Sequence, residues 1–282
     1  MCQRVYKNVP CALRHIFILS GRCITMLKAL VLTGYGINCE NESRYSIVKS
    51  GGAADILHLN RLLDNPLLLE NYNMLFIPGG FAFGDDLGSG KVFGNKMRFH
   101  MREPLERFIS AGKLVLGNCN GFQILAKMGL LPEPDFTQRV SLIANDSGHF
   151  EDRWVILRGN SSSPCVFTKG IDALLVPVRH GEGKFVTANE DILKKMKEKN
   201  QIVFQYVDEH GSFAGYPYNP NGSVESIAGI CDASGRICGM MPHPEAFNMP
   251  ENCPYWVKGN VKEALGLRVF KNAVQYAQDN GL

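Results

Sequence analysis

The sequence predicts an α/β fold with a mostly parallel central sheet flanked by helices and an added layer of antiparallel strands. From residue 27 to residue 128, short apolar runs alternate with segments of helical periodicity, which is typical of repeated β-α-β units. Between residues 134 and 232, short strands are separated by turn formers such as Asn219-Pro-Asn-Gly222. Ligands of parallel sheets bind beyond the carboxyl ends of the strands, so a functional site is expected there.

The expected elements follow one another in a regular order. In the first part of the chain, strands are expected at residues 27–33, 55–59, 74–78 and 114–116, and helices at residues 39–50, 102–111 and 122–128. In the second part, strands are expected at residues 154–157, 174–178, 203–207 and 227–231, and an amphipathic helix at residues 261–280.

Residues 1–25 differ from the rest of the chain. They hold four of the 30 basic residues and none of the 27 acidic residues, so residues 26–282 have a net charge of −1. A near-neutral body gives no reason to expect a nucleic-acid or membrane partner. The apolar cluster at residues 16–19 is too short for a secretory signal. We expect residues 1–25 to be an extension outside the fold, from an upstream start or a weak targeting signal, and residues 26–282 to form one domain.

Composition narrows the class of protein further. A chain of 282 residues with 45% hydrophobic content can bury a sizeable core. No apolar run approaches the ~20 residues that span a bilayer, so no transmembrane segment is expected. The nine cysteines include no C-x-x-C pair and no zinc-type spacing, and their odd number leaves a thiol unpaired. We therefore expect no metal site and a reducing, cytoplasmic location.

The stretch Gly117-Asn-Cys-Asn-Gly121 lies between an apolar strand and a helical run. Glycines on either side of Cys119 permit the sharp strand-to-helix turn of a nucleophile elbow, here with sulfur in place of serine oxygen. The helix N-terminus then favours the thiolate. The alternative is a buried structural cysteine, because unpaired cysteines are usually small core residues. A base elsewhere in the chain decides between the two.

That base is found in His243-Pro-Glu245. Pro244 favours an extended His243, and residues two apart on an extended segment point the same way, so the imidazole and the Glu245 carboxylate are expected to share a face. A thiol nucleophile needs such a pair, in which the imidazole takes the proton and the carboxylate orients it. A structural histidine in a proline turn is the alternative.

The glycine-rich loop at residues 78–91 has two possible uses. A phosphate-binding loop would need glycine in place of Asp85 and Ser or Thr in place of Val92, so that interpretation is rejected. Gly79 and Gly80 follow a strand end, where backbone N–H groups can approach a substrate and help to bind an oxyanion. An ordinary glycine turn remains the alternative.

These motifs resemble those of the class I triad glutamine amidotransferases, which have a flavodoxin-like sheet. More narrowly, the chain resembles the glutaminase subunits of phosphoribosylformylglycinamidine synthase. The stretches that carry this narrower resemblance are Pro78-Gly-Gly-Phe-Ala-Phe-Gly-Asp85, Gly121-Phe-Gln-Ile-Leu125, Asn145-Asp-Ser-Gly-His-Phe-Glu-Asp-Arg-Trp154, Arg179-His-Gly-Glu-Gly183 and Asn219-Pro-Asn-Gly-Ser223. Ala246 and Asp86-Leu-Gly88 depart from the family pattern, outside the triad.

The resemblance implies a role for each matched residue. Cys119 matches the nucleophile, His243 the general base and Glu245 its orienter. The residues that match oxyanion and glutamine contacts are Gly79, Gly80, Asn120, Gln123, His180 and Gly181. The implied reaction is glutamine hydrolysis, with ammonia passing to a separate synthetase subunit that binds ATP and Mg²⁺ and makes phosphoribosylformylglycinamidine. No cofactor is implied for this chain, and a small accessory subunit remains open.

Three alternatives stay open from the sequence: an amidotransferase that supplies another acceptor, a cysteine hydrolase, and a non-catalytic binding subunit with a triad-like site. The aromatic stretch at residues 247–260 has two possible uses, a docking surface or packing against the last helix.

Overall fold

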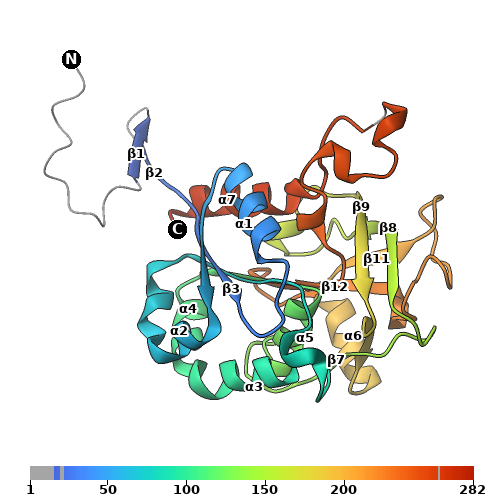
Figure 1. The fold of residues 1–282 in the computed structure, drawn as a ribbon, viewed down its shortest axis with the longest axis horizontal. Helices are drawn as coiled ribbons and strands as arrows, with labels where there is room; N and C mark the ends of the chain where they lie inside the picture. Colours follow the sequence, from blue (N-terminus) through green and yellow to red (C-terminus); the bar gives the residue numbers. More distant parts are fainter. Residues whose placement is uncertain (1–15, 20–21, 260) are drawn as a thin grey trace, which may run out of the picture.

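A nine-stranded sheet forms the centre of the computed structural model, which describes residues 16–19, 22–259 and 261–282 (Figure 1). In order across the sheet, the strands are β4 (Ala53–His58), β3 (Lys28–Thr33), β5 (Met74–Ile77), β6 (Leu114–Asn118), β13 (Ile237–Met240), β12 (Ile227–Cys231), β11 (Ile202–Val207), β8 (Glu151–Gly159) and β9 (Ala173–His180). The first five are parallel to one another, and β12, β11, β8 and β9 continue the sheet with antiparallel pairing from β13 onward.

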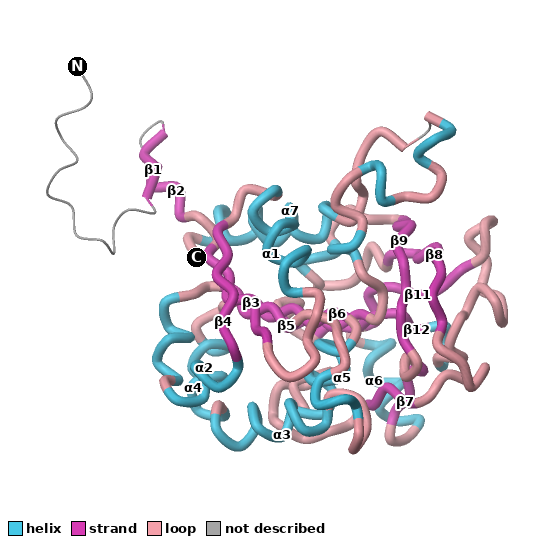
Figure 2. The backbone as a smooth tube through the Cα atoms, in the orientation of Figure 1, coloured by secondary structure: helices cyan, strands magenta, loops and turns pink. Residues whose placement is uncertain are grey.

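Helices cover both faces of this sheet (Figure 1). The face covered by α1 (Glu40–Lys49) and α7 (Leu267–Asn280) lies opposite the face covered by α2 (Leu59–Asp64), α3 (Lys91–His100), α4 (Arg102–Ser110), α5 (Asn120–Met128) and α6 (Glu190–Glu198). A small antiparallel pair, β7 (Val140–Ile143) with β10 (Lys184–Thr187), lies beside α6 (Figure 2). The expected α/β class, with its mostly parallel sheet, is confirmed.

Alternation along the strands produces the two cores. Leu30 and Leu32 of β3 pack with α2 to α5, whereas Ala29 and Val31 pack with α1 and α7. Successive residues of a strand point to opposite faces, so a strand covered on both sides reads as a continuous apolar run. The site therefore stands on a sheet that is buried from both sides.

Several sequence-based boundaries are confirmed to within one residue, as for β3, β5, β11 and β12. The prediction of a last helix from residue 261 is wrong at its start, because α7 begins at Leu267. A Cβ on the preceding Gly266 would lie 2.0 Å from the Pro244 carbonyl oxygen, so this position packs against the chain that follows His243. The helices α3 and α6 and the strand β13 were not anticipated.

The antiparallel strands expected after residue 134 are present, but most of them extend the central sheet, whereas β7 and β10 form a pair apart from it. In the 247–260 stretch, Tyr255 and Trp256 are about half exposed, at 51% and 47%, whereas Phe247 and Cys253 are buried. The two outer rings therefore remain open to solvent. No helix in the described ranges has the length and apolar character needed to cross a bilayer.

The described part of the N-terminal extension forms a hairpin of β1 (Ile16–Leu19) and β2 (Arg22–Thr25), paired only with each other (Figure 1). Residues 1–15 and 20–21, also part of that extension, lie outside the described residues. The division into an extension and a domain from residue 26 stays a prediction.

Candidate active site

Cys119 lies in a sharp turn between β6, which ends at Asn118, and α5, which begins at Asn120. Its φ of 51° and ψ of −109° lie in a region that side chains rarely adopt, a strain that is characteristic of functional turns. A Cβ on Gly121 would lie 1.8 Å from the Ile77 carbonyl oxygen, and one on Gly117 would lie 2.6 Å from the Gly121 carbonyl oxygen. Both glycines are therefore required for the turn to fit, and the backbone has the shape of a nucleophile elbow.

Strand pairing explains why His243 lies near Cys119. β13 is the parallel neighbour of β6, with Met240 in register with Asn118, and the Cys119 N–H donates to the Met240 carbonyl at 2.8 Å. Parallel neighbours end at the same edge of a sheet, so the chain leaving each strand emerges at one place. Cys119 and His243 both emerge there.

His243 is held by Glu245, although not in the way that the sequence suggested. The expected extended segment is wrong, because Pro244–Ala246 forms one turn of 3₁₀-helix. The carboxylate nevertheless reaches the imidazole, with Glu245 Oε1 2.6 Å from His243 Nδ1. Asn118 Nδ2 donates to the other oxygen, Oε2, at 2.6 Å. Because Glu245 is fully buried, this carboxylate is fixed by two short hydrogen bonds.

Gly79 marks the point where the side chains meet. A Cβ at this position would lie 2.7 Å from His243 Cε1, 3.3 Å from Cys39 Sγ and 3.4 Å from Cys119 Cβ. The same groups line a cavity of about 110 Å³, whose walls are formed by Asn38, Cys39, Gly80, Phe81, Cys119, Phe150, Arg179 and His243. The cysteine and histidine of the predicted triad are therefore brought together in one hollow at the carboxyl edge of the parallel strands.

The charges around His243 favour its protonated form. Burial lowers the pKa of this imidazole, but the Glu245 carboxylate and then the neighbouring Cys119 outweigh it and raise the pKa well above 6.5. Nδ1 is already bonded to Glu245, and Nε2 is buried without a hydrogen-bond partner among the described residues, so Nε2 is the nitrogen left to exchange a proton with the sulfur. A raised pKa makes the neutral imidazole a stronger base, so it can take the proton of the thiol, and the imidazolium that results can give that proton to a leaving group.

Cys39 is a second thiol in the cavity, which the sequence did not point to. Its Sγ lies 4.0 Å from His243 Nδ1, the nitrogen that Glu245 already occupies, and donates to Asn38 Oδ1 at 3.3 Å. Burial is the main cause that raises the pKa of this thiol. A nucleophile needs the nitrogen opposite the carboxylate, so the geometry favours Cys119 over Cys39 for this role.

Cys39, His243 and Glu245 also have ligand atoms within 4.8 Å of one another, close enough to hold a metal ion. However, Nδ1 and Oε1 are only 2.6 Å apart and share a hydrogen bond. A zinc ion would have to separate them, because each ligand atom stands about 2 Å from the metal in tetrahedral directions. The arrangement suits a hydrogen-bonded pair better than a ligand set.

The backbone of Gly79 and Gly80 presents a donor to the cavity. The Gly79 carbonyl accepts hydrogen bonds from the N–H groups of Asn38 and Cys39, both at 3.2 Å. In a trans peptide, the carbonyl and the following N–H point in opposite directions, so the Gly80 N–H is turned away from those donors. Gly80 lines the cavity, with a φ of 152° that favours glycine.

Asn120 supplies a second candidate donor. It is the first residue of α5, and the N–H groups of a first helical turn have no partner within the helix. Its side chain supports the loop after Gly80, since Asn120 Oδ1 accepts from the Ala82 N–H at 3.1 Å. The use of the Gly80 and Asn120 N–H groups as an oxyanion hole stays a prediction.

Gln123, His180 and Gly181 are not among the residues that line the cavity. Gln123 accepts from Asn120 Nδ2 at 2.8 Å and donates to the Glu182 carbonyl at 2.5 Å. His180 is buried, and burial, aided by His243, lowers its pKa to about 3, so its ring is neutral. The Gly181 carbonyl accepts from the Asn145 N–H at 3.0 Å. The structure places all three in contacts that hold the end of β9, and their contact with glutamine stays a prediction.

Sequence reasoning missed several lining residues, among them Phe81, Phe150 and Arg179. It also missed Asn118, although its position directly before Cys119 was a usable signal. Arg179 was inside a recognised stretch, directly before His180, yet it received no role. Phe81, Phe150 and Arg179 lie at the cavity because of contacts between distant segments of the chain, and a local sequence pattern does not contain such contacts.

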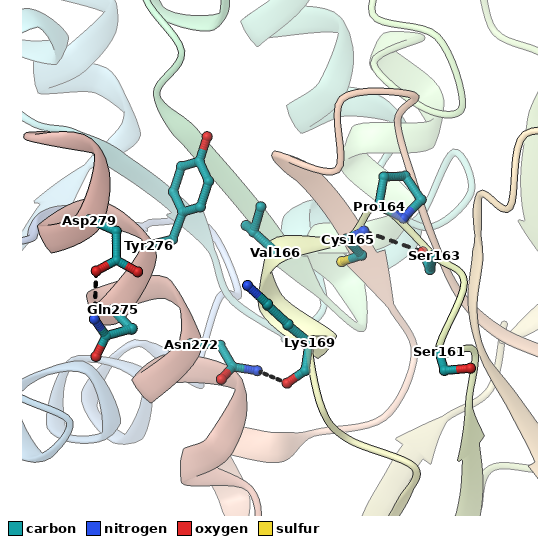
Figure 3. A pocket seen from close by; sticks show the side chains of 10 residues that line it. All are labelled: Ser161, Ser163, Pro164, Cys165, Val166, Lys169, Asn272, Gln275, Tyr276 and Asp279. Carbon is teal, nitrogen blue, oxygen red and sulfur yellow. Dashed lines mark hydrogen bonds between the residues drawn. The ribbon is translucent and has the colours of Figure 1, made fainter.

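Four larger hollows lined by described residues do not combine a cysteine with a histidine. One of about 370 Å³ lies between the 161–169 segment and α7 (Figure 3). Its polar groups bond one another, as Gln275 Nε2 does with Asp279 at 2.8 Å and Asn272 Nδ2 with the Lys169 carbonyl at 2.9 Å. Although Cys165 lines it, no histidine does. The smaller cavity at Cys119 is therefore the candidate active site.

Comparison with known proteins agrees with this geometry. Residues 26–277 match the model of the CobB/CobQ-like glutamine amidotransferase domain. Two similar curated proteins are named phosphoribosylformylglycinamidine synthase subunit PurQ. The one from Methanococcus maripaludis strain C7 is 44% identical over 268 residues, covering 88% of this chain and 97% of that protein. The one from Dehalococcoides mccartyi is 43% identical over 258 residues, covering 90% and 99%.

A solved structure is similar as well. A chain in the structure of PurLQS from Thermotoga maritima superimposes with a TM-score of 0.67 at 29% identity, covering 89% of this chain and 99% of that chain. Together with the family match, these relatives show that the chain belongs to the CobB/CobQ-like glutamine amidotransferases and, within them, to the phosphoribosylformylglycinamidine synthase subunits PurQ.

Proposed function

We propose that this chain hydrolyses glutamine to glutamate and ammonia and supplies the ammonia to a synthetase subunit. That subunit converts formylglycinamide ribonucleotide to phosphoribosylformylglycinamidine in de novo purine biosynthesis. The observation that carries the proposal is the meeting of Cys119 and His243 across Gly79, with Glu245 on the far nitrogen of the imidazole. The names of the relatives support the acceptor.

The residues give a complete sequence of steps. The Cys119 thiol gives its proton to His243, and the sulfur attacks the side-chain amide carbon of glutamine. The resulting oxyanion accepts hydrogen bonds from the Gly80 and Asn120 N–H groups. When the C–N bond breaks, His243 returns the proton to the nitrogen, which leaves as ammonia. Water, deprotonated by His243, then hydrolyses the γ-glutamyl thioester and releases glutamate and the Cys119 thiol.

The ammonia acceptor belongs to other subunits in this proposal. The similar T. maritima chain comes from a PurLQS structure, which supports assembly of this chain with a large synthetase subunit and a small accessory subunit. ATP and Mg²⁺ bind to the synthetase and not to this chain. We place the complex in the cytoplasm, because the cysteines from Cys39 to Cys253 are all free thiols.

The test uses the chain reconstituted with its native synthetase. Cys119→Ser and His243→Ala should each abolish glutamine-dependent synthesis and leave ammonia-dependent synthesis intact. A diazo-ketone analogue of glutamine should label Cys119, and peptide mass mapping identifies the labelled thiol. Cys39→Ser is the matched comparison, because this thiol lies in the same cavity but should not be required for labelling.

Each alternative function predicts a different result. Glutamine hydrolysis without phosphoribosylformylglycinamidine formation would indicate another acceptor. Ester hydrolysis in preference to glutamine would indicate a cysteine hydrolase. If Cys119→Ser leaves all activity unchanged and no thiol is labelled, the triad is not catalytic and the proposal is wrong. Loss of ammonia-dependent synthesis in both variants would show a structural role instead.

A further inference from the structure

Arg179 occupies a special position on the wall of the active-site cavity. It is the second-last residue of β9, and its carbonyl oxygen lies 3.5 Å from Cys119 Sγ. Arg179 and His243 are the two basic residues among those that line this cavity. A substrate bound to the sulfur therefore lies beside the backbone of Arg179, from which the arginine side chain starts.

The guanidinium of Arg179 has no partner among the residues that the structure describes. Its Nε and Nη2 atoms are buried and make no hydrogen bond to any of them. Asp152 stands directly opposite on β8, yet no ion pair joins the two in the described part of the chain. By contrast, Arg153, on the same strand as Asp152, donates hydrogen bonds to both Glu151 and Tyr216, as partly buried arginines usually do. Buried donors without partners are costly, so Arg179 is arranged to receive an acceptor from outside the protein.

Asp152 is exposed to solvent and forms no ion pair with Arg179 in the described part of the chain, and two other acidic side chains are already in use. Glu245 is bonded to His243 and Asn118, and Glu182 accepts the Ser89 N–H at 3.3 Å. The missing partner is therefore an anion that enters the cavity. A planar guanidinium matches a carboxylate best, because two parallel N–H groups can bond its two oxygens.

The length of glutamine fits this placement. In the extended molecule, the α-carboxylate carbon lies roughly 5 Å from the amide carbon that sulfur attacks, given four C–C bonds of about 1.5 Å. An arginine side chain has a similar reach. Arg179 starts beside the sulfur, so its guanidinium can meet the far end of a substrate whose amide is at Cys119.

From this we infer that Arg179 binds the α-carboxylate of glutamine and selects substrates that carry this charge, an inference that rests on the proposed glutaminase function. The side chain acts on substrate binding and not on the chemical step, since the triad and the oxyanion donors are formed by other residues. Its loss should therefore raise KM for glutamine and change kcat much less.

The experiment compares two substrates with the complex reconstituted from the full chain and its native synthetase. One is L-glutamine, and the other is its α-amide, in which a neutral group replaces the α-carboxylate. Arg179→Gln should lower kcat/KM for glutamine by about 10- to 100-fold, the range expected when a charged hydrogen-bonding partner is lost. It should change kcat/KM for the α-amide by less than about threefold. Arg179→Lys should give an intermediate kcat/KM for glutamine, because lysine keeps the positive charge but lacks the two parallel N–H groups of the guanidinium.

Two controls separate substrate binding from structure. Ammonia-dependent synthesis should be unchanged in Arg179→Gln and Arg179→Lys. Arg158→Gln should behave as wild type with both substrates, because the Arg158 guanidinium is exposed and stacks 4.0 Å from the Phe213 ring centre.

Equal losses for glutamine and the α-amide in Arg179→Gln would show a structural role and overturn the inference. No loss with either substrate would overturn it as well. Both of these outcomes leave the proposed function standing, because the wild-type complex would still use glutamine. A wild-type complex that does not hydrolyse glutamine would overturn the proposed function and this inference together.

Discussion

Replacing Gly79 by alanine should separate glutamine use from folding by adding a single methyl group. Gly79 lies between the two reacting side chains, and its backbone is not in the left-handed region, so alanine is not strained there. The new Cβ would lie 2.7 Å from His243 Cε1 and 3.4 Å from Cys119 Cβ. The methyl group therefore acts on the side chains of His243 and Cys119 and on Cys39, whose Sγ would lie 3.3 Å from it.

The expected magnitude follows from these distances. Carbon atoms pack at about 3.5–4.0 Å, so His243 must move by roughly 1 Å. A misplacement of about 1 Å at a reacting group costs on the order of 100-fold in rate. Overpacking a filled site costs about 1–3 kcal/mol of stability, which a domain of this size withstands. We expect glutamine-dependent kcat to fall about 100-fold while the protein stays folded.

The assay is glutamine-dependent and ammonia-dependent synthesis by the reconstituted complex, with thermal unfolding of the isolated variant. Gly215→Ala is the matched control, because no atom lies within 4 Å of the Cβ it would add and its φ is not positive. It should retain both activities. A folded Gly79→Ala variant with unchanged glutamine use would refute the geometry, because Cys119 and His243 would not then act across this position.

Three further predictions test other parts of the structure. Asn118→Ala should lower the free energy of unfolding by about 1.5–3 kcal/mol, because it removes the 2.6 Å hydrogen bond to Glu245, and denaturant unfolding measures this. It should also reduce kcat more than it raises KM in steady-state kinetics, because it removes no substrate contact. Glu245→Gln should lower the pKa of His243, which is raised in the folded wild-type protein. The stability that the protonated ring adds to the wild type is complete below about pH 6.5 and is lost as pH rises through the folded pKa, so the difference in free energy of unfolding between wild type and variant should shrink over that range. A difference that does not depend on pH would contradict this. Deletion of residues 1–25 should leave activity and Tm unchanged, and a large drop in Tm would show that the extension belongs to the fold.

The parallel half of the fold could be predicted because local sequence determines it. A strand buried on both faces is a short apolar run, and β3, β5 and β6 have this pattern. β13 was missed because Gly239 interrupts its apolar residues. A Cβ at Gly239 would lie 2.2 Å from the Phe122 ring, so the glycine is required by packing from α5. No local pattern contains that requirement.

Part of the candidate site could likewise be predicted from local sequence, and part could not. The elbow at Cys119 was predictable, because its glycines are neighbours in sequence and serve one turn. The pairing of His243 with Glu245 was predicted from an extended segment that does not exist, and the contact arises instead from a 3₁₀ turn. Cys39 and Arg179 were missed, because they reach the cavity through contacts between distant segments.

The antiparallel half of the sheet completes the site that the parallel half begins. β9 is the edge strand and is separated from β13 by three other strands, yet its Pro177 carbonyl accepts the His243 N–H at 2.8 Å. The Arg179 carbonyl lies 3.5 Å from the Cys119 sulfur. An edge strand can reach that far only if the antiparallel half curls back over the carboxyl ends of the parallel strands, as the right-handed twist of sheets permits. The parallel half thus provides the nucleophile and base, while the curled half provides the wall against which a substrate is selected. Substitutions on β9 that face the cavity should therefore change substrate preference, whereas substitutions at the ends of β6 and β13 should change the rate of the chemical step.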